Sequence, residues 1–278
     1  MHDLLPIFHV WMDDMSEDIT RYAVFAIGTW LVLWVFLGSM LRSRKIRPDT
    51  PPARQMVIEF LCSLRSIAVF STIGLSTVFL SKAGLVPGTQ IANHWGPVWF
   101  WVSLGVMIIA HDAWFYWTHR LIHDRRLFRW FHRRHHRSFN PSPFTAYSFD
   151  LGEAAINGVF VPIWVLIVPT SWEVVGLFML HQIVRNTIGH SGYEIFPADR
   201  RGRPLLPWLT TVTHHDLHHA QAGWNYGLYF THWDRLMGTE HPKYLERFAQ
   251  AVGHNRCPTE MATPKTTDRL ATEHSGEL

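Results

Sequence analysis

Three short segments of this chain are crowded with histidine. Five of its 19 histidines fall within 18 consecutive positions, residues 119–136, and four more fall within residues 214–219. The segments read HRLIH, HRRHH and HDLHH, which are the spacings HX3H, HX2HH and HX2HH. Residues three or four apart lie on one face of a helix, so each segment can present its histidines together. Because neutral imidazole is the commonest metal ligand among side chains, the pattern predicts a metal centre.

The candidate ligands are too numerous for one ion, since a zinc site, for example, usually takes four ligands. A further histidine, His190 in the stretch GHSGY, follows Asn186 by four residues and so repeats the spacing of the first segment. Asn186 could hold a water molecule bound to the metal. We therefore expect two metal ions, bound by His119, His123, His132, His135, His136, His190, His215, His218 and His219.

Two carboxylates lie near these histidines. Asp112 precedes His119 by seven residues on the same helical stripe, and Asp216 lies within the last segment. Metal-bound histidines usually donate their second ring N–H to a carboxylate or a carbonyl, so both are candidates for that role. We therefore predict Asp112, Asp216 and Asn186 as catalytic residues. The alternative for Asp112 is a polar residue paired inside a helix bundle, although an ionisable group at membrane depth is more often functional than idle. The tenth ligand is left open between Asn186, His214 and His181.

Long apolar stretches surround the histidines. Residues 22–41 carry no charge over 20 positions, the length that a membrane-spanning helix needs. Further candidate spans run over about 56–85 and 95–117, and a hairpin-like pair follows over 151–168 and 171–188, for which buried core helices are the alternative. The predicted fold class is all-α, an integral-membrane helical bundle with a cytoplasmic helical cap that carries the histidine segments.

The distribution of Lys and Arg predicts the orientation. The loop 42–54 carries five of them, whereas the first 20 residues carry five acidic residues and neither Lys nor Arg. Cytoplasmic loops are enriched in Lys and Arg, so we expect the N-terminus outside and this loop inside. The third span then returns the chain to the cytoplasm, where seven arginines fall within residues 120–137. All three histidine segments would lie on the cytoplasmic side.

The chain of 278 residues allows one integrated membrane domain with additions. We expect an N-terminal segment, 1–55, with an added membrane helix and the basic loop, then a catalytic domain over 56–257 and a disordered tail over 258–278. The two cysteines, Cys62 and Cys257, lie far apart and imply neither a disulfide framework nor a thiolate metal site. We expect no nucleic-acid partner.

The histidine segments and their flanks resemble the fatty acid hydroxylase/sterol desaturase superfamily of integral-membrane di-iron oxygenases. The resemblance runs over about residues 95–239 and includes DAWFYWTHRLIH and HDLHHAQAGWNYGLYFTHWDRLMGT. It implies that the nine histidines bind two iron ions, although zinc could occupy the same ligands in purified protein. It also implies a lipid substrate from the bilayer, O2, and a separate electron donor such as a ferredoxin, a cytochrome b5-like protein or a reductase. Asn186 stands where several relatives are expected to have a histidine.

Imidazole ligands suit iron, as they suit zinc and copper, and oxygen activation needs a redox-active metal. We therefore predict an O2-dependent enzyme that hydroxylates an unactivated C–H position of a fatty acyl chain, membrane lipid or sterol, with desaturation less favoured. A membrane zinc hydrolase would use the same imidazoles to produce hydroxide, with Glu153 as its candidate base. A metal transporter would instead place histidines within the spans. Chain length, the topology and the lack of a fused electron carrier favour a bacterial inner membrane.

Overall fold

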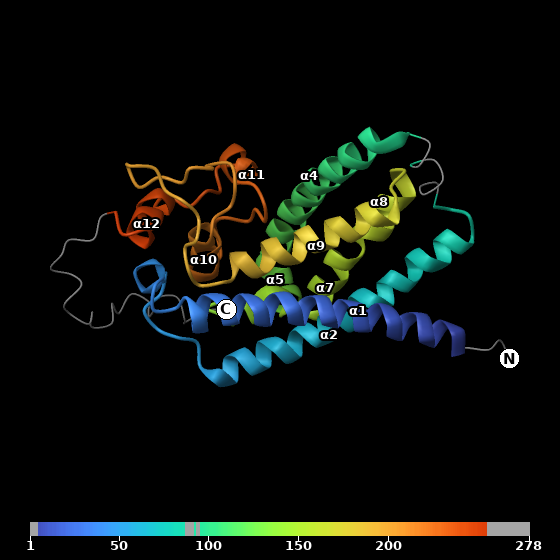
Figure 1. Ribbon diagram of the computed structural model, residues 1–278, viewed down its shortest axis with the longest axis horizontal. Coiled ribbons are helices and arrows are strands. Elements are labelled where there is room, and N and C mark those ends of the chain that lie inside the picture. Colours follow the sequence, from blue (N-terminus) through green and yellow to red (C-terminus); the bar gives the residue numbers. More distant parts are fainter. Residues whose placement is uncertain (1–4, 87–91, 93–94, 255–278) are drawn as a thin grey trace.

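The computed structural model describes residues 5–86, 92 and 95–254 (Figure 1). These residues form helices and loops, and the β-structure among them is limited to isolated bridges. Three of the described helices are long and apolar enough to cross a membrane: α1 with its continuation η1 over Leu5–Phe36, α2 over Ala53–Lys82, and α4 over Gly96–Ile122. The predicted all-α class, with a bundle of apolar helices, is confirmed, whereas the side of the membrane on which the cap lies stays a prediction.

The first helix starts earlier than the charge-free run predicts. Helix α1 (Leu5–Trp30) already contains the acidic stretch, and it continues into one wider turn, η1 (Leu31–Phe36), before the chain turns. Arg21 forms an ion pair with Asp18 one turn away, which offsets part of the cost of both charges in the helix. Tyr22 is fully buried against α2 and the segment that follows the second histidine segment. Counting uncharged residues alone therefore placed the helix too late.

The predicted hairpin is present as three helices. Helices α7 (Leu151–Gly158) and α8 (Phe160–Ile167) lead away from the histidines, and α9 (Trp172–Gly189) brings the chain back beside α4 (Figure 1). The Trp99 indole on α4 donates a hydrogen bond of 2.7 Å to the Pro169 carbonyl and so ties α4 to the turn of the hairpin. Side chains from α4, α8 and α9 share one apolar core. The ends of α4 and α9 are thereby held at one end of the bundle.

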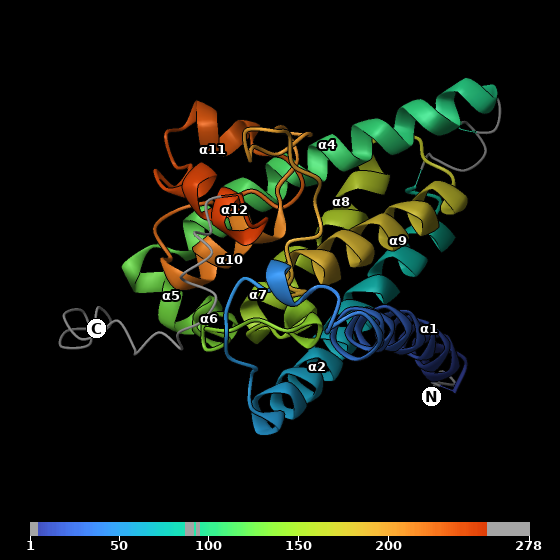
Figure 2. The same cartoon turned by 60° about the vertical axis from the view of Figure 1, so that its left-hand side comes forward.

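Short helices collect at that end and form the cap (Figures 1 and 2). They are η2 (Arg42–Arg44), α5 (Arg125–Phe131), α6 (Arg133–His136), α10 (Val212–Ala220), α11 (His232–Leu236) and α12 (Tyr244–Ala251). A further short helix, η3 (Pro143–Tyr147), packs against α1, α2 and α9 of the bundle.

The basic loop after η1 is part of this cap. The Ile46 amide donates a hydrogen bond of 3.1 Å to the Gly192 carbonyl, and Arg47 Nε lies 2.7 Å from Asp216 Oδ1 on α10. The N-terminal segment thus packs on the residues that follow it, at both its helix and its loop. The domain boundary at residue 55 stays a prediction, and the predicted disordered tail, 258–278, lies outside the described residues.

Candidate metal centre

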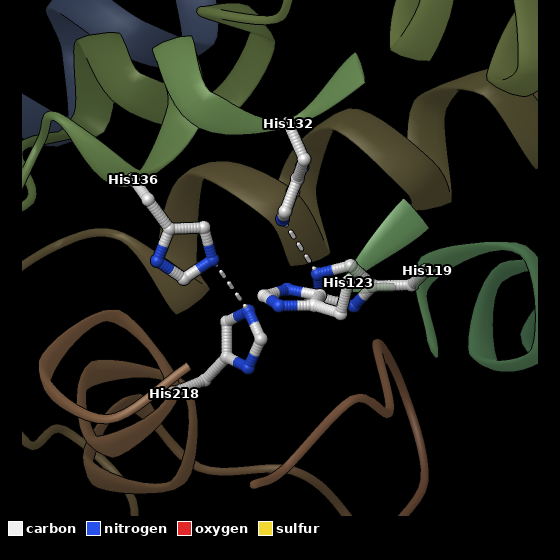
Figure 3. Close-up of side chains that lie close together, drawn as sticks. All are labelled: His119, His123, His132, His136 and His218. Atoms are coloured by element: carbon white, nitrogen blue, oxygen red, sulfur yellow. Dashed lines mark hydrogen bonds between the residues drawn. The ribbon is translucent and has the colours of Figure 1, made fainter. Parts of the chain in front are cut away.

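All nine predicted ligands come together in two groups, where the cap meets the ends of α4 and α9. Within each group the candidate ligand atoms lie within 4.8 Å of one another. Group A consists of His119, His123, His132, His136 and His218 (Figure 3). Group B consists of His135, His190, His215 and His219.

The two HX2HH segments explain why there are two groups. In the first, His132 and His136 are four residues apart and belong to group A, whereas His135 belongs to group B. The last segment, on α10, has the opposite arrangement, because His215 and His219 belong to group B and the histidine between them belongs to group A. Each segment therefore contributes two histidines, one helical turn apart, to one group and a single histidine to the other. Of two adjacent histidines, such as His135 and His136, one belongs to each group.

Hydrogen bonds to backbone carbonyls orient three of the rings. His119 Nδ1 lies 2.9 Å from the Tyr226 carbonyl oxygen, and His218 Nδ1 lies 2.7 Å from that of Trp224. In group B, His190 Nδ1 lies 2.8 Å from the carbonyl oxygen of Asn186, one turn earlier on α9. A carbonyl only accepts hydrogen bonds, so each of these Nδ1 atoms carries the proton. Each Nε2 atom is then left with its lone pair directed into the group.

The contacts between rings fit a cation. His119 Nε2 lies 2.9 Å from His132 Nε2 (Figure 3). His132 Nδ1 lies 2.8 Å from the carboxyl group of Glu153. The Nδ1 proton of His119 is directed at the Tyr226 carbonyl, so the lone pair of His119 Nε2 faces His132 Nε2 across this gap. Ligand atoms about 2.1 Å from one metal ion are separated by roughly 3.0–3.4 Å, so the two ring nitrogens lie close to the separation that a shared ion would give. Similar contacts join His136 to His218 at 3.0 Å and His190 to His215 at 2.9 Å.

The protonation states also suit metal binding. Burial lowers the pKa of His136 to about 3, and burial together with neighbouring imidazoles lowers the pKa values of His135, His218 and His219 well below the usual range. The rings are therefore neutral, which is the form that binds a metal ion. His123 Nε2 and both ring nitrogens of His219 are buried without a hydrogen-bond partner in the described part of the chain. Orphaned buried nitrogens of this kind fit a site that a metal ion completes.

The predicted catalytic carboxylates lie outside both groups. Asp112 Oδ1 accepts hydrogen bonds from the backbone amides of Tyr229 at 2.8 Å and Phe230 at 3.2 Å. Asp216 is paired with Arg47. Within the described residues, the carboxylate that contacts a ring of either group is that of Glu153. The catalytic roles of Asp112 and Asp216 stay predictions.

The three candidates for a tenth ligand also lie outside the groups. The Asn186 side-chain amide donates a hydrogen bond of 2.7 Å to the Ala146 carbonyl, while its backbone carbonyl orients His190. The His214 ring is buried against Tyr244, with ring centroids 5.0 Å apart. The partly buried His181 packs against the Tyr229 ring, with centroids 4.5 Å apart. The catalytic role given to Asn186 stays a prediction, and its backbone is the part that meets the centre.

Two features of the site were missed by reasoning from the sequence. Glu153 was considered only as the base of a hydrolase, and the carbonyl groups of Trp224 and Tyr226 were not considered as partners of histidines. Every residue has a backbone carbonyl, so the residue type does not reveal which carbonyl accepts a hydrogen bond from a histidine. The stretch WNYG, which lies a few residues beyond the last histidine segment, was the signal available for this part of the site.

Comparisons with known proteins show the family of this chain. Residues 104–239 match the family model described as "Fatty acid hydroxylase". Methylsterol monooxygenase 1 of Rattus norvegicus is 32% identical over 252 residues, which cover 80% of each chain. Cholesterol 25-hydroxylase of Rattus norvegicus is 28% identical over 219 residues, 72% of this chain and 66% of the relative. Lathosterol oxidase of Mus musculus is 30% identical over 152 residues, 52% and 49% of the two chains. No solved structure matches significantly.

The matched region begins within α4, at residue 104, and ends at residue 239, three residues after the end of α11. It contains all nine candidate ligands. The relatives are sterol oxygenases and desaturases, which supports an oxidoreductase that acts on a lipid, and the three apolar helices support a membrane protein. The family that the histidine segments predicted is thereby confirmed: the chain belongs to the fatty acid hydroxylase family.

Proposed function

We propose that this chain is a di-iron enzyme that uses O2 to hydroxylate an unactivated C–H position of a membrane lipid, with one iron in group A and one in group B. The observation that carries the proposal is the gathering of nine histidines, eight of them buried, in two groups whose candidate ligand atoms lie within 4.8 Å of one another. Three contacts between ring nitrogens, at 2.9, 3.0 and 2.9 Å, join rings within these groups. The residues of both groups fit a metal ion, and both groups lack thiolates. When bound, iron would supply the activation of O2.

The chain's own residues hold the ligands and keep water away from them. Phe115 on α4 lies one turn before His119, with ring centroids 4.9 Å apart, and Phe149 packs on His135 at 5.3 Å. Both phenylalanines are buried, so apolar rings cover the groups on the side of the helical bundle. Such a wall suits a lipid that reaches the centre from the bilayer, and it excludes water from the reacting carbon.

A sterol or another apolar lipid is the substrate class that this proposal favours. The relatives act, by their names, on methylsterols, lathosterol and cholesterol. Hydroxylation is the outcome we propose first, and desaturation of the same lipid class is the second, since one relative is a sterol 5(6)-desaturase by name.

The hydrolase alternative has less support. Its candidate base, Glu153, lies against His132 Nδ1. The carboxyl group therefore contacts a candidate metal ligand and is not directed at a position where an attacking water would bind. A transporter would need ligands along the spans, whereas the nine candidates lie at one end of the bundle. We therefore retain the oxygenase as the proposed function.

The cap belongs on the cytoplasmic side in this proposal. Exposed arginines follow α4 at positions 125, 126, 129, 133 and 137, and the basic loop at residues 42–47 lies in the same cap. Basic segments of this kind remain on the cytoplasmic side and suit anionic headgroups. Electrons would then come from a separate cytoplasmic donor, a ferredoxin, a cytochrome b5-like protein or a reductase. A bacterial inner membrane stays a prediction from the sequence.

Incorporation of labelled oxygen tests this function. The purified iron-loaded protein is mixed in detergent with a lipid extract or defined sterols, a reductant and 18O2. We expect a hydroxylated lipid that is heavier by one 18O atom and that forms only when O2 and reductant are present. Lipid cleavage that proceeds without O2, with no hydroxylated product, would show that the centre is a hydrolase.

A further inference from the structure

Group A depends on a segment that follows α10 and contains no histidine. Residues 224–227, Trp-Asn-Tyr-Gly, pass across the centre between α10 and α11. The Trp224 carbonyl accepts the hydrogen bond from His218 Nδ1 at 2.7 Å, and the Tyr226 carbonyl accepts that from His119 Nδ1 at 2.9 Å. Two ligands from different helices are thus oriented by two carbonyl groups that are two residues apart.

The residue between those carbonyls is held in an uncommon conformation. Asn225 is fully buried and has φ of 58°, in the left-handed region that asparagine adopts more readily than most residues. Its side-chain amide donates a hydrogen bond of 2.8 Å to the His214 carbonyl, and its side-chain oxygen accepts one of 2.7 Å from the His241 amide. The direction of the two neighbouring carbonyls is therefore fixed by a residue bonded on both sides.

Asp234 holds the other end of the segment. This fully buried carboxylate accepts hydrogen bonds from the Tyr226 amide at 2.8 Å and from the Gly227 amide at 2.9 Å. A Cβ atom at Gly227 would lie 2.6 Å from the Phe230 carbonyl oxygen and 2.9 Å from Asp234 Oδ2, so no side chain fits there without moving the backbone. Glycine at this position allows the close approach that puts the Tyr226 carbonyl beside His119.

Within the described residues, no ring of group B is hydrogen-bonded to residues 224–227. The ring of its His190 is oriented by the Asn186 carbonyl within the same helix, α9. A movement of residues 224–227 would therefore remove the partners of two rings in group A and leave that bond in group B in place.

We propose that residues 224–227, fixed by Asn225 and Asp234, are a positioning segment that orients His119 and His218 and so sets metal affinity at group A selectively. The proposal rests on the proposed function in one respect, which is that the two groups each bind a metal ion. Loss of a partner that orients a metal-bound histidine typically lowers metal affinity 10–100-fold, and a change of that size is expected at group A alone.

The test compares two glycines of the same loop. In Gly227→Ala the added methyl group pushes the segment from Asp234, whereas a Cβ atom at Gly223 meets no atom within 4 Å, so Gly223→Ala is a matched control. Metal-free full-length protein in detergent is titrated anaerobically with Co2+, and the visible absorption of bound Co2+ reports both the number of ions and their ligand geometry.

We expect two ions of Co2+ per chain in the wild type and in Gly223→Ala. Gly227→Ala should bind one ion normally and the other 10–100-fold more weakly, with an altered absorption spectrum for that ion. Asp234→Asn, which keeps one carbonyl acceptor, should shift the same ion in the same direction. The ion that is still bound normally shows that each variant is folded.

Two results would overturn the proposal. One is two normally bound ions with an unchanged spectrum in both Gly227→Ala and Asp234→Asn. The other is equal weakening of both ions, because the segment would then not act on group A selectively. A wild-type chain that binds fewer than two ions would instead contradict the proposed di-metal function, and the inference with it.

Discussion

His132 and Glu153 meet inside the cap, with His132 Nδ1 2.8 Å from Glu153 Oε2 and both side chains buried. Neither atom has a hydrogen-bond partner within the described residues, and burial raises the pKa of the Glu153 carboxyl group well above its usual range. Glu153 reaches this ring from α7, a helix that leads away from the centre. A carboxylate at the second nitrogen of a metal-bound imidazole makes the ring a stronger ligand.

Replacement of the Glu153 carboxyl group should weaken metal binding at group A. In Glu153→Gln we expect affinity for one of the two ions to fall by about 10–100-fold, because His132 loses the carboxyl group that lies against its second ring nitrogen. Anaerobic iron titration measures the change. Glu173→Gln, at an exposed position on α9, is the control and should bind both ions normally. Normal binding of both ions in Glu153→Gln, with loss of activity alone, would favour the hydrolase base over the role described here.

Two adjacent residues should control different ions. His135 belongs to group B and His136 to group A, so His135→Ala and His136→Ala should each retain about one iron per chain, and the double variant should retain none. All three should lose activity, while His254→Ala, at an exposed position, should keep both irons. Metal analysis of purified protein gives the counts. A double variant that retains as much iron as either single variant would show that the two histidines serve one site.

Asp112 offers a test between a positioning and a charge-dependent role. Asp112 Oδ1 accepts both backbone hydrogen bonds, and an asparagine carbonyl can accept the same two. Asp112→Asn should therefore remain active, whereas Asp112→Ala should lose about 1–3 kcal/mol of stability for each amide left unpaired. Thermal unfolding in detergent and activity are the measurements. A folded but inactive Asp112→Asn variant would support the catalytic role that the sequence suggested.

The ion pair of Arg47 with Asp216 should stabilise the cap without affecting the metals. Arg47 Nε donates to the Asp216 carboxylate at 2.7 Å, and a second guanidinium nitrogen donates to the Asp216 backbone carbonyl at 3.3 Å. The pair is partly exposed. Arg47→Ala should lower the stability by about 1 kcal/mol and leave two irons per chain. Arg54→Ala, at an exposed position, should change neither. Loss of an iron from Arg47→Ala would mean that the basic loop shapes the centre itself.

The histidines were predictable because their spacing is local. Positions three and four apart determine a shared helical face, so the nine candidates could be read from the sequence. Their division into groups A and B could not be predicted from the sequence. It depends on the break in the helix at His132 and on the orientation of α10 relative to α6. Spacing within one segment carries no information about the orientation of another.

The partners of Asp112 and Glu153 could not be predicted for a related reason. Asp112 binds amides that are 117 and 118 positions away, and Glu153 meets a histidine through the fold of α7. The beginning of α1 was missed because Asp18 and Arg21 neutralise each other, which a count of charges does not register. Contacts between distant segments and the pairing of opposite charges could not be predicted from the sequence and are known only from the structure.

The most direct test of the account is the metal content of the full-length protein, purified in detergent after growth with 57Fe and limited zinc, together with its Mössbauer spectrum. The account predicts two irons per chain with the spectrum of a magnetically coupled pair, as expected for groups A and B side by side. A single iron, or two uncoupled irons in protein that is fully loaded, would contradict it, as would two zinc ions that iron cannot replace.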